Sequence, residues 1–155
     1  MAAKAGPRSG VHGAGPQTAV RHGHPAAADL VEKGSKIKSA KELWERDRIE
    51  DPLISLPTNE SIYQNFQAGL MKLGVDWFSG IEVSTIDLVE TYVANGYGIG
   101  LSIAVPKKKQ RPELRALPLD DFPSVSFGMF WQGKPTPILE AFLAASQQAA
   151  QVLMS

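Results

Sequence analysis

The chain has 155 residues, room for about one domain, and its 16 lysine and arginine residues balance 16 aspartate and glutamate residues. This balance gives no electrostatic footprint for nucleic acid, whose binding rests mostly on neutralisation of phosphates by lysine and arginine. The absence of cysteine excludes disulfides, cysteine zinc sites and thiol catalysis. No apolar run reaches the ~20 residues that cross a bilayer, and no signal-peptide core is visible, so we expect a cytoplasmic protein without membrane contact.

Residues 1–23 consist largely of Ala, Gly, Pro, His and Arg and contain almost no large apolar residue. Such a segment cannot bury enough surface to offset the entropy lost on ordering, so a disordered N-terminal arm is predicted. Its basic residues Arg21, His22 and His24 are more readily explained by solvation than by a metal or phosphate site.

A short helix over 40–45 is predicted by the capping box of Ser39 and Glu42. Pro52 then introduces an apolar strand over 53–56.

A longer helix over about 59–73 follows the junction Pro-Thr-Asn-Glu-Ser at 57–61. One stripe of this helix is apolar, and Gly74 stands where a left-handed cap needs no side chain. The stripe consists of Ile62, Phe66, Leu70 and Leu73.

The stretch IEVSTIDLVETYVANGYGIGLSIAVP, residues 81–106, predicts a strand, a helix and a second strand. Hydroxyls of Ser84 and Thr85 can cap the helix start, and Gly96 suits its C-terminal cap. The apolar run 99–105 has the pattern of a strand covered on both faces. This βαβ unit predicts a parallel sheet with right-handed crossovers.

The remaining elements are strands over 114–119 and 125–131 and a last helix over 138–153, for which Thr136 is a candidate cap. The basic loop 107–111 is interpreted as an exposed turn in preference to a nucleic-acid contact.

Catalytic motifs are not apparent. Gly96, Gly98 and Gly100 follow a helix and precede a strand, whereas a dinucleotide fingerprint needs a strand, then glycines, then a helix. The three histidines lie near the N-terminal arm, and the carboxylates of the central unit occupy ordinary strand and helix positions. We therefore expect neither an enzyme nor a cofactor or metal site.

Polar side chains gather at both strand-to-helix junctions. In open parallel sheets, ligands lie outside the carboxyl ends of the strands, and unpaired N–H groups at a helix start attract anions. Two readings remain open for each residue, namely a cap for its own helix or part of a small-molecule site. The residues concerned are Thr58, Ser61, Ser84 and Thr85.

With these residues in view, the chain resembles the effector-binding domain of LysR-type transcriptional regulators. The resemblance is carried by PLISLPTNES (52–61), by the helix, glycine, strand and proline run of 81–106, and by the ending at 114–145. It extends over roughly 24–153.

The resemblance implies an α/β fold, a lobe like those of type II periplasmic binding proteins, with a flavodoxin-like, open, mostly parallel sheet and helices on both faces. Residues 24–124 would form the second lobe, and residues 125–155 a return strand and helix that would complete a missing first lobe. Residues 103–105 would lie near the cleft floor or between the lobes. The implied effector-binding residues are Leu56, Thr58, Asn59 and Ser61, with Ser84 and Thr85 across the cleft.

The implied function is regulation of transcription by binding a small effector, a carboxylate, phosphate or sulfate, within a homo-oligomer. DNA contact would come only through a winged helix-turn-helix that this chain lacks. The alternative is a solute-binding protein of a transport system, which shares the fold. A small enzyme with a flavodoxin-like sheet is disfavoured because no acid–base set is present.

Overall fold

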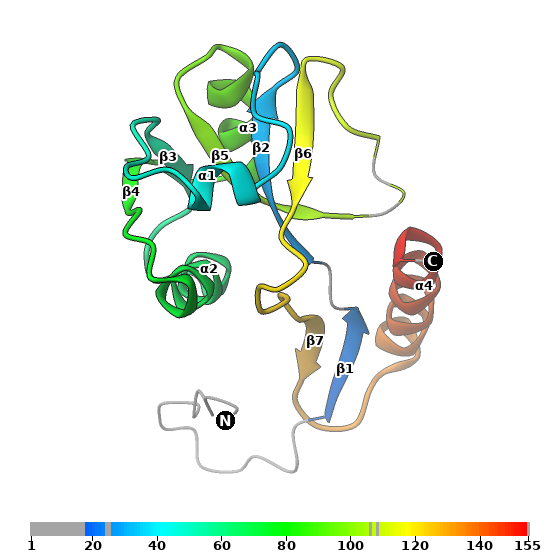
Figure 1. Cartoon of the computed structure of the whole chain (residues 1–155). Coiled ribbons are helices and arrows are strands. Elements are labelled where there is room, and N and C mark those ends of the chain that lie inside the picture. The colour runs from blue at the N-terminus through cyan, green and yellow to red at the C-terminus, as the bar shows by residue number, and fades with distance from the viewer. Residues whose placement is uncertain (1–17, 24–25, 106, 108, 155) are drawn as a thin grey trace.

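The computed structural model describes residues 18–23, 26–105, 107 and 109–154 (Figure 1). The strands are β1 (Thr18–Gly23), β2 (Ala26–Glu32), β3 (Leu53–Ser55), β4 (Ser79–Glu82), β5 (Ile99–Ala104), β6 (Leu114–Pro118) and β7 (Phe127–Trp131). The helices are α1 (Lys41–Trp44), α2 (Ser61–Leu73), α3 (Ile86–Ala94) and α4 (Pro137–Met154). None of the described helices is long and apolar enough to cross a membrane.

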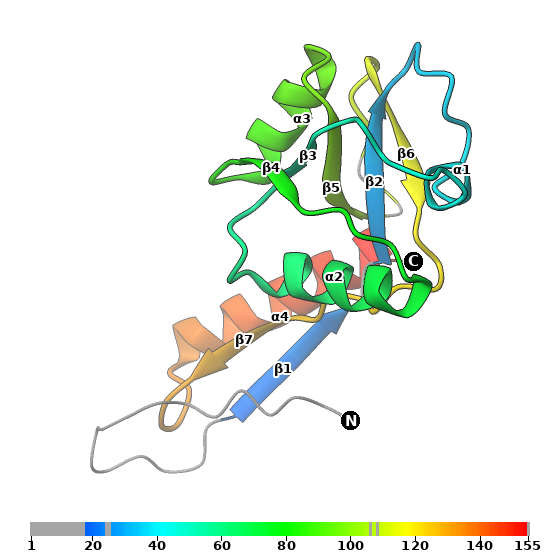
Figure 2. The same cartoon turned by 60° about the vertical axis from the view of Figure 1, so that its left-hand side comes forward.

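Five strands form the main sheet in the order β4-β3-β5-β2-β6. β3 is parallel to β4 and β5, whereas β2 is antiparallel to both of its neighbours, β5 and β6. Four strands therefore run in one direction and β2 runs against them. Helices α2 and α3 follow β3 and β4 as crossovers within this sheet (Figure 2). The predicted α/β fold with an open, mostly parallel sheet is confirmed.

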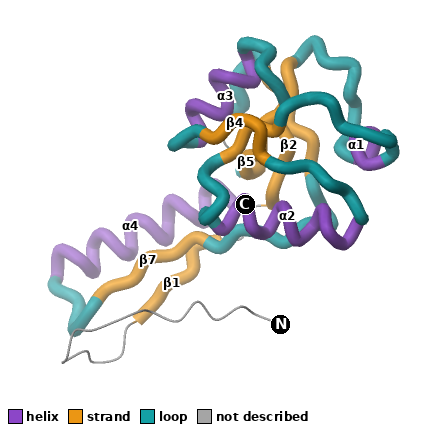
Figure 3. Tube along the Cα trace, turned by 90° about the vertical axis from the view of Figure 1, so that its left-hand side faces the viewer, coloured by secondary structure: helices purple, strands orange, loops and turns teal. Residues whose placement is uncertain are grey.

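The second sheet contains β1 and β7, which pair antiparallel, and α4 lies beside it (Figure 3). The prediction of a disordered arm was wrong for residues 18–23. They pair with β7, and the ladder hydrogen bonds supplied by that distant strand stabilise a segment that has little apolar patterning of its own. The rest of the predicted arm, residues 1–17, lies outside the described residues.

Helices cover both faces of the main sheet (Figure 2). On one face, α1 and α2 bury an aromatic group in which the Phe66 ring stacks on Phe122 at 5.4 Å and Trp77 meets Trp44 at 6.1 Å. On the other face, α3 packs Val89 and its neighbours against the sheet. Burial of these two clusters is the main stabilising contribution to the main sheet and its helices.

The helix ends agree with most of the predicted signals. The Thr85 hydroxyl accepts a hydrogen bond from the Leu88 N–H at 3.2 Å, as an N-cap does, and Thr136 receives the Leu139 N–H at 3.3 Å. Gly74 ends α2 with a left-handed φ of 68°.

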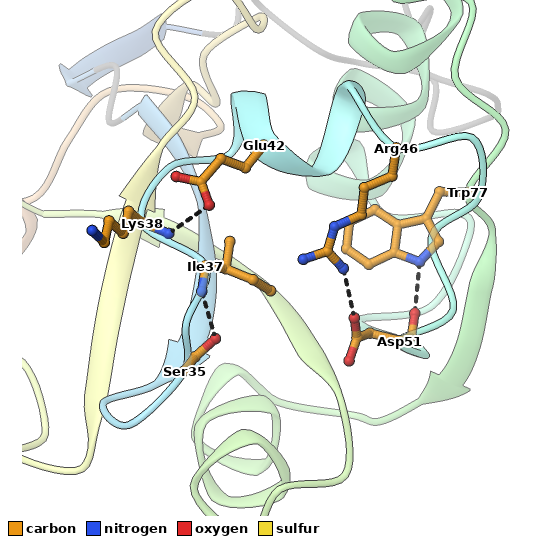
Figure 4. A network of polar contacts seen from close by, with 7 residues as sticks. All are labelled: Ser35, Ile37, Lys38, Glu42, Arg46, Asp51 and Trp77. Atoms are coloured by element: carbon orange, nitrogen blue, oxygen red, sulfur yellow. Dashed lines mark hydrogen bonds and ion pairs between the residues drawn. The ribbon is translucent and has the colours of Figure 1, made fainter.

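The predicted capping box at the start of α1 was wrong. Ala40 occupies the cap position, and no side chain caps this helix. The Glu42 carboxylate instead accepts the Lys38 N–H at 3.2 Å (Figure 4), which fixes the loop before α1. In the same view Asp51 accepts from Arg46 at 3.4 Å through its carboxylate and from the Trp77 indole at 2.9 Å through its carbonyl.

Gly96, in the turn between α3 and β5, and Gly100, in β5, each have a structural role. Gly96 has a φ of 76°, a conformation that L side chains rarely adopt. At Gly100 an added Cβ would stand 2.6 Å from methyl carbons of Val89 and Val93, so this glycine allows α3 to approach β5 closely.

Candidate functional site

A hollow of about 350 Å³ lies where β3 and β5 end and α2 and α3 begin. This is the carboxyl edge of the parallel strands, the position at which open α/β sheets bind ligands. Its lining residues come from both helix starts, from β5, from the residue that follows β3 and from the segment that leads to β7. They are Leu56, Glu60, Ser61, Ile62, Ile86, Ile103, Val125 and Ser126.

The start of α2 supplies the polar part of this hollow. The Glu60 N–H donates to the Pro57 carbonyl at 2.9 Å, and Glu60 itself has an extended backbone at the N-cap position. No side chain caps the helix. The first N–H groups of an α-helix have no partner within the helix, so those of Ser61 and Ile62 offer a positive, hydrogen-bonding end beside the hollow.

The start of α3 is built differently. The Thr85 hydroxyl is engaged with the Leu88 N–H, and both Ser84 and Thr85 are exposed outside the lining of the hollow. The contribution of α3 to the hollow is the side chain of Ile86. The two helix starts therefore share one hollow, but one contributes uncapped N–H groups and the other an apolar wall.

Of the six residues proposed from the sequence, the structure brings Leu56 and Ser61 together at the hollow. The other four are exposed and do not line it: Thr58, Asn59, Ser84 and Thr85. Ile103, which the family resemblance placed near the cleft floor, does line the hollow.

Sequence reasoning missed the apolar wall, which includes Ile62, Ile86 and Val125. The available signal was position, because Ile62 and Ile86 fall at the starts of helices that follow parallel strands. Glu60 is the ionisable residue among the lining residues and is itself exposed. The hollow therefore suits a small ligand with an apolar body and a single polar or anionic end.

Other hollows lie elsewhere on the described part of the chain, including one of about 500 Å³ beside Val152 and Leu153 of α4. One of about 520 Å³ borders Met71 and Phe78, and another of about 340 Å³ lies between Trp44 and the turn at 118–122. Neither of these two lies between the starts of α2 and α3, although Pro118, which lines the hollow of about 340 Å³, is at the carboxyl end of β6. Among the described residues, no group of three His, Cys, Asp or Glu side chains could hold a metal ion.

Comparison with solved structures shows which known proteins share this fold. The chain is similar to HinK, a LysR family transcriptional regulator from Pseudomonas aeruginosa, with a TM-score of 0.68 and 16% identity over 86% of this chain and 48% of that one. It is also similar to the CcmR regulatory domain of Synechocystis PCC6803 in complex with 2-PG, with a TM-score of 0.66 and 15% identity over 89% and 71% of the two chains.

A third similar structure is the effector-binding domain of QuiR in complex with shikimate, with a TM-score of 0.65 and 8% identity over 90% of this chain and 68% of that one. At these identities the likeness shows only the fold. The fold is that of LysR effector-binding domains, which resembles the fold of type II periplasmic binding proteins. No curated protein matches the chain.

The family follows from the sequence match. Residues 39–151 match the LysR substrate binding domain, and the chain belongs to this family. The chain spans about half the length of HinK, whose structure it matches over 48%.

Proposed function

We propose that this chain is the effector-sensing part of a LysR-type transcriptional regulator and that the hollow between the starts of α2 and α3 binds a small anionic metabolite. One observation carries the proposal: the uncapped start of α2 opens on an apolar hollow at the carboxyl edge of the sheet. The ligand's anionic group would accept hydrogen bonds from the N–H groups of Ser61 and Ile62. Its apolar body would pack against Ile86 and Ile103.

The position of the hollow supports a sensing role. Val125 and Ser126 line it and lead directly into β7, the strand that pairs with β1 in the second sheet. A ligand there would contact both the main sheet and the segment that leaves it. Binding shifts the balance between two arrangements of the sheets only as far as the ligand binds one arrangement more tightly than the other.

The site would act by binding and not by catalysis. Its described lining holds one carboxylate, Glu60, and no histidine, cysteine or lysine. Membership of the LysR family favours regulation over a transport function. DNA binding would be the task of another part of the full regulator.

Substitution of Ser61 tests the proposal. Ser61 is the first residue of α2, where proline is tolerated, and Glu60 before it has the extended backbone (φ −75°, ψ 141°) that proline requires of its neighbour. Ser61→Pro removes one N–H from the site and keeps the helix, whereas Ser61→Ala keeps the N–H and removes the hydroxyl.

Calorimetric titration of the wild-type chain and both variants should use shikimate, 2-PG and sulfate as probes. A hydrogen bond to a charged group contributes about 1.5 kcal/mol or more, so Ser61→Pro should weaken binding of the active probe about tenfold or more, and Ser61→Ala should weaken it less. Equal affinity of wild type and Ser61→Pro would contradict the proposed site.

A further inference from the structure

Asp29 is a carboxylic acid in the interior of the main sheet. It lies in the middle of β2, the strand between β5 and β6, and is 0% exposed. Neither of its carboxyl oxygens has a hydrogen-bond partner among the described residues. Alternate residues of a strand face the same way. Ala27 and Val31, two residues before and after Asp29 on β2, belong to the cluster beneath α1 and α2. The Asp29 side chain therefore faces that cluster.

The strands beside Asp29 provide no counter-charge. Its register partners are Leu101 on β5 and Leu117 on β6, both fully or almost fully buried. β3 and β5 contain no ionisable residue. β6 contains Arg115, two residues along from Leu117, but its guanidinium donates to the carbonyl oxygens of Ser35 and Ile37.

The elements that cover this face of the sheet, α1, α2 and the turn at 118–122, provide no counter-charge either. On α1, Lys41 and Glu45 pair with each other at 3.7 Å with side chains at least 63% exposed. Glu42 accepts the Lys38 N–H (Figure 4). On α2, the Tyr63 hydroxyl accepts the Ser79 N–H and Lys72 is exposed. Asp120 and Asp121 of the turn at 118–122 are exposed, and Arg46 after α1 pairs with Asp51 at 3.4 Å. Glu90 is on α3, over the opposite face.

We propose that Asp29 is a proton-binding site that couples folding of this lobe to pH: the folded sheet holds the side chain as a neutral acid, and its ionisation destabilises the core around β2. An ionised carboxylate buried without a partner is far more costly than the neutral acid. Burial accordingly raises the pKa of Asp29 well above its ordinary value, through desolvation of the charged form.

The direction of the pH dependence follows from linkage. In the unfolded chain an aspartate ionises near pH ~3.9. Between that pH and the higher pKa of the folded state, the folded chain binds one proton more than the unfolded chain, so raising the pH favours unfolding. The Asp29 contribution to stability is complete below the unfolded pKa and is lost as the pH rises to the folded pKa. One proton changes the folding equilibrium constant by up to about tenfold per pH unit.

Urea unfolding of the full chain at pH 5, 6, 7 and 8 tests the proposal, with Asp29→Asn as the matched variant that has the same shape and cannot ionise. The ratio of the wild-type folding constant to that of Asp29→Asn should fall as the pH rises, by up to about tenfold per unit. A ratio that is constant over this range would overturn the proposal.

Carbon-13 NMR of Asp29 in the wild-type chain provides a readout that needs no variant. At pH 6 its carboxyl carbon should have the chemical shift of a neutral acid. The shift of an ionised carboxylate at that pH would overturn the proposal even if Asp29→Asn failed to fold.

Discussion

The close approach of α3 to β5 makes Gly100→Ala a quantitative test of the packing. The new Cβ would stand 2.6 Å from methyl carbons of both Val89 and Val93, and 3.5 Å from the Leu30 Cβ. Both valines are 0% exposed, so neither can move into solvent. Overpacking of this kind lowers the free energy of unfolding by about 1–3 kcal/mol. Replacing a strand glycine by alanine raises it by about 0.5–1 kcal/mol, because glycine loses more conformational entropy on folding. With the middle of each range, about 2 kcal/mol lost by overpacking and about 0.75 kcal/mol gained by the alanine, the expected net loss of stability is about 1.25 kcal/mol.

Urea denaturation followed by circular dichroism measures this loss as a lower midpoint with an unchanged slope. Gly34→Ala is the matched control, because a Cβ there would meet no atom within 4 Å, and its stability should lie within about 0.5 kcal/mol of wild type. Adding Val93→Ala to Gly100→Ala should cost less than Val93→Ala does alone, since the smaller side chain makes room for the new methyl. A Gly100→Ala chain as stable as wild type would refute the close packing of α3 on β5.

Three further substitutions test the cap, the aromatic cluster and the charge at the site. Thr85→Ala should lower the unfolding free energy by about 1 kcal/mol through loss of the N-cap bond, while Thr85→Ser keeps most of it; equal losses in thermal melts would contradict the cap. Gly69→Ala places a Cβ 2.2 Å from the Phe122 ring. It should cost up to about 2 kcal/mol in urea denaturation, because overpacking costs about 1–3 kcal/mol and alanine gains about 1 kcal/mol over glycine in a helix. Phe122→Leu should relieve part of this loss, and an unchanged midpoint would contradict the contact. Glu60→Gln should tighten binding of anionic probes at low salt in calorimetric titration, because it removes a like charge from the hollow; weaker binding would show that the carboxylate helps hold the ligand.

Elements with strong local signals could be predicted from the sequence. The periodic apolar stripe of α2, the hydroxyl of Thr85 and the conformation required at Gly96 each determine local structure without help from distant residues. β1 and β2 could not be predicted in this way. β2 begins with three alanines and carries a buried aspartate, and it is a strand because β5 and β6 provide partners on both sides.

The candidate site could likewise be predicted only in part. The junction pattern indicated Ser61 and Leu56, since turn residues before a helix reveal where a strand ends. The apolar wall was not predicted, because an isoleucine such as Ile86 at a helix start looks the same in sequence whether it faces a core or a hollow. The choice between cap and ligand for Thr85 also needed coordinates, which show its hydroxyl in the cap.

The central claim is that the start of α2 binds a small anion in the hollow beside it. Nitrogen-15 NMR of the chain during titration with shikimate, 2-PG and sulfate tests this directly, because backbone N–H signals report the contact residue by residue. We predict that at least one probe shifts the amide signals of Ser61 and Ile62 most strongly, together with that of Ile103. Largest shifts beside Met71 and Phe78, at the hollow of about 520 Å³, or no saturable shift with any probe, would contradict the claim.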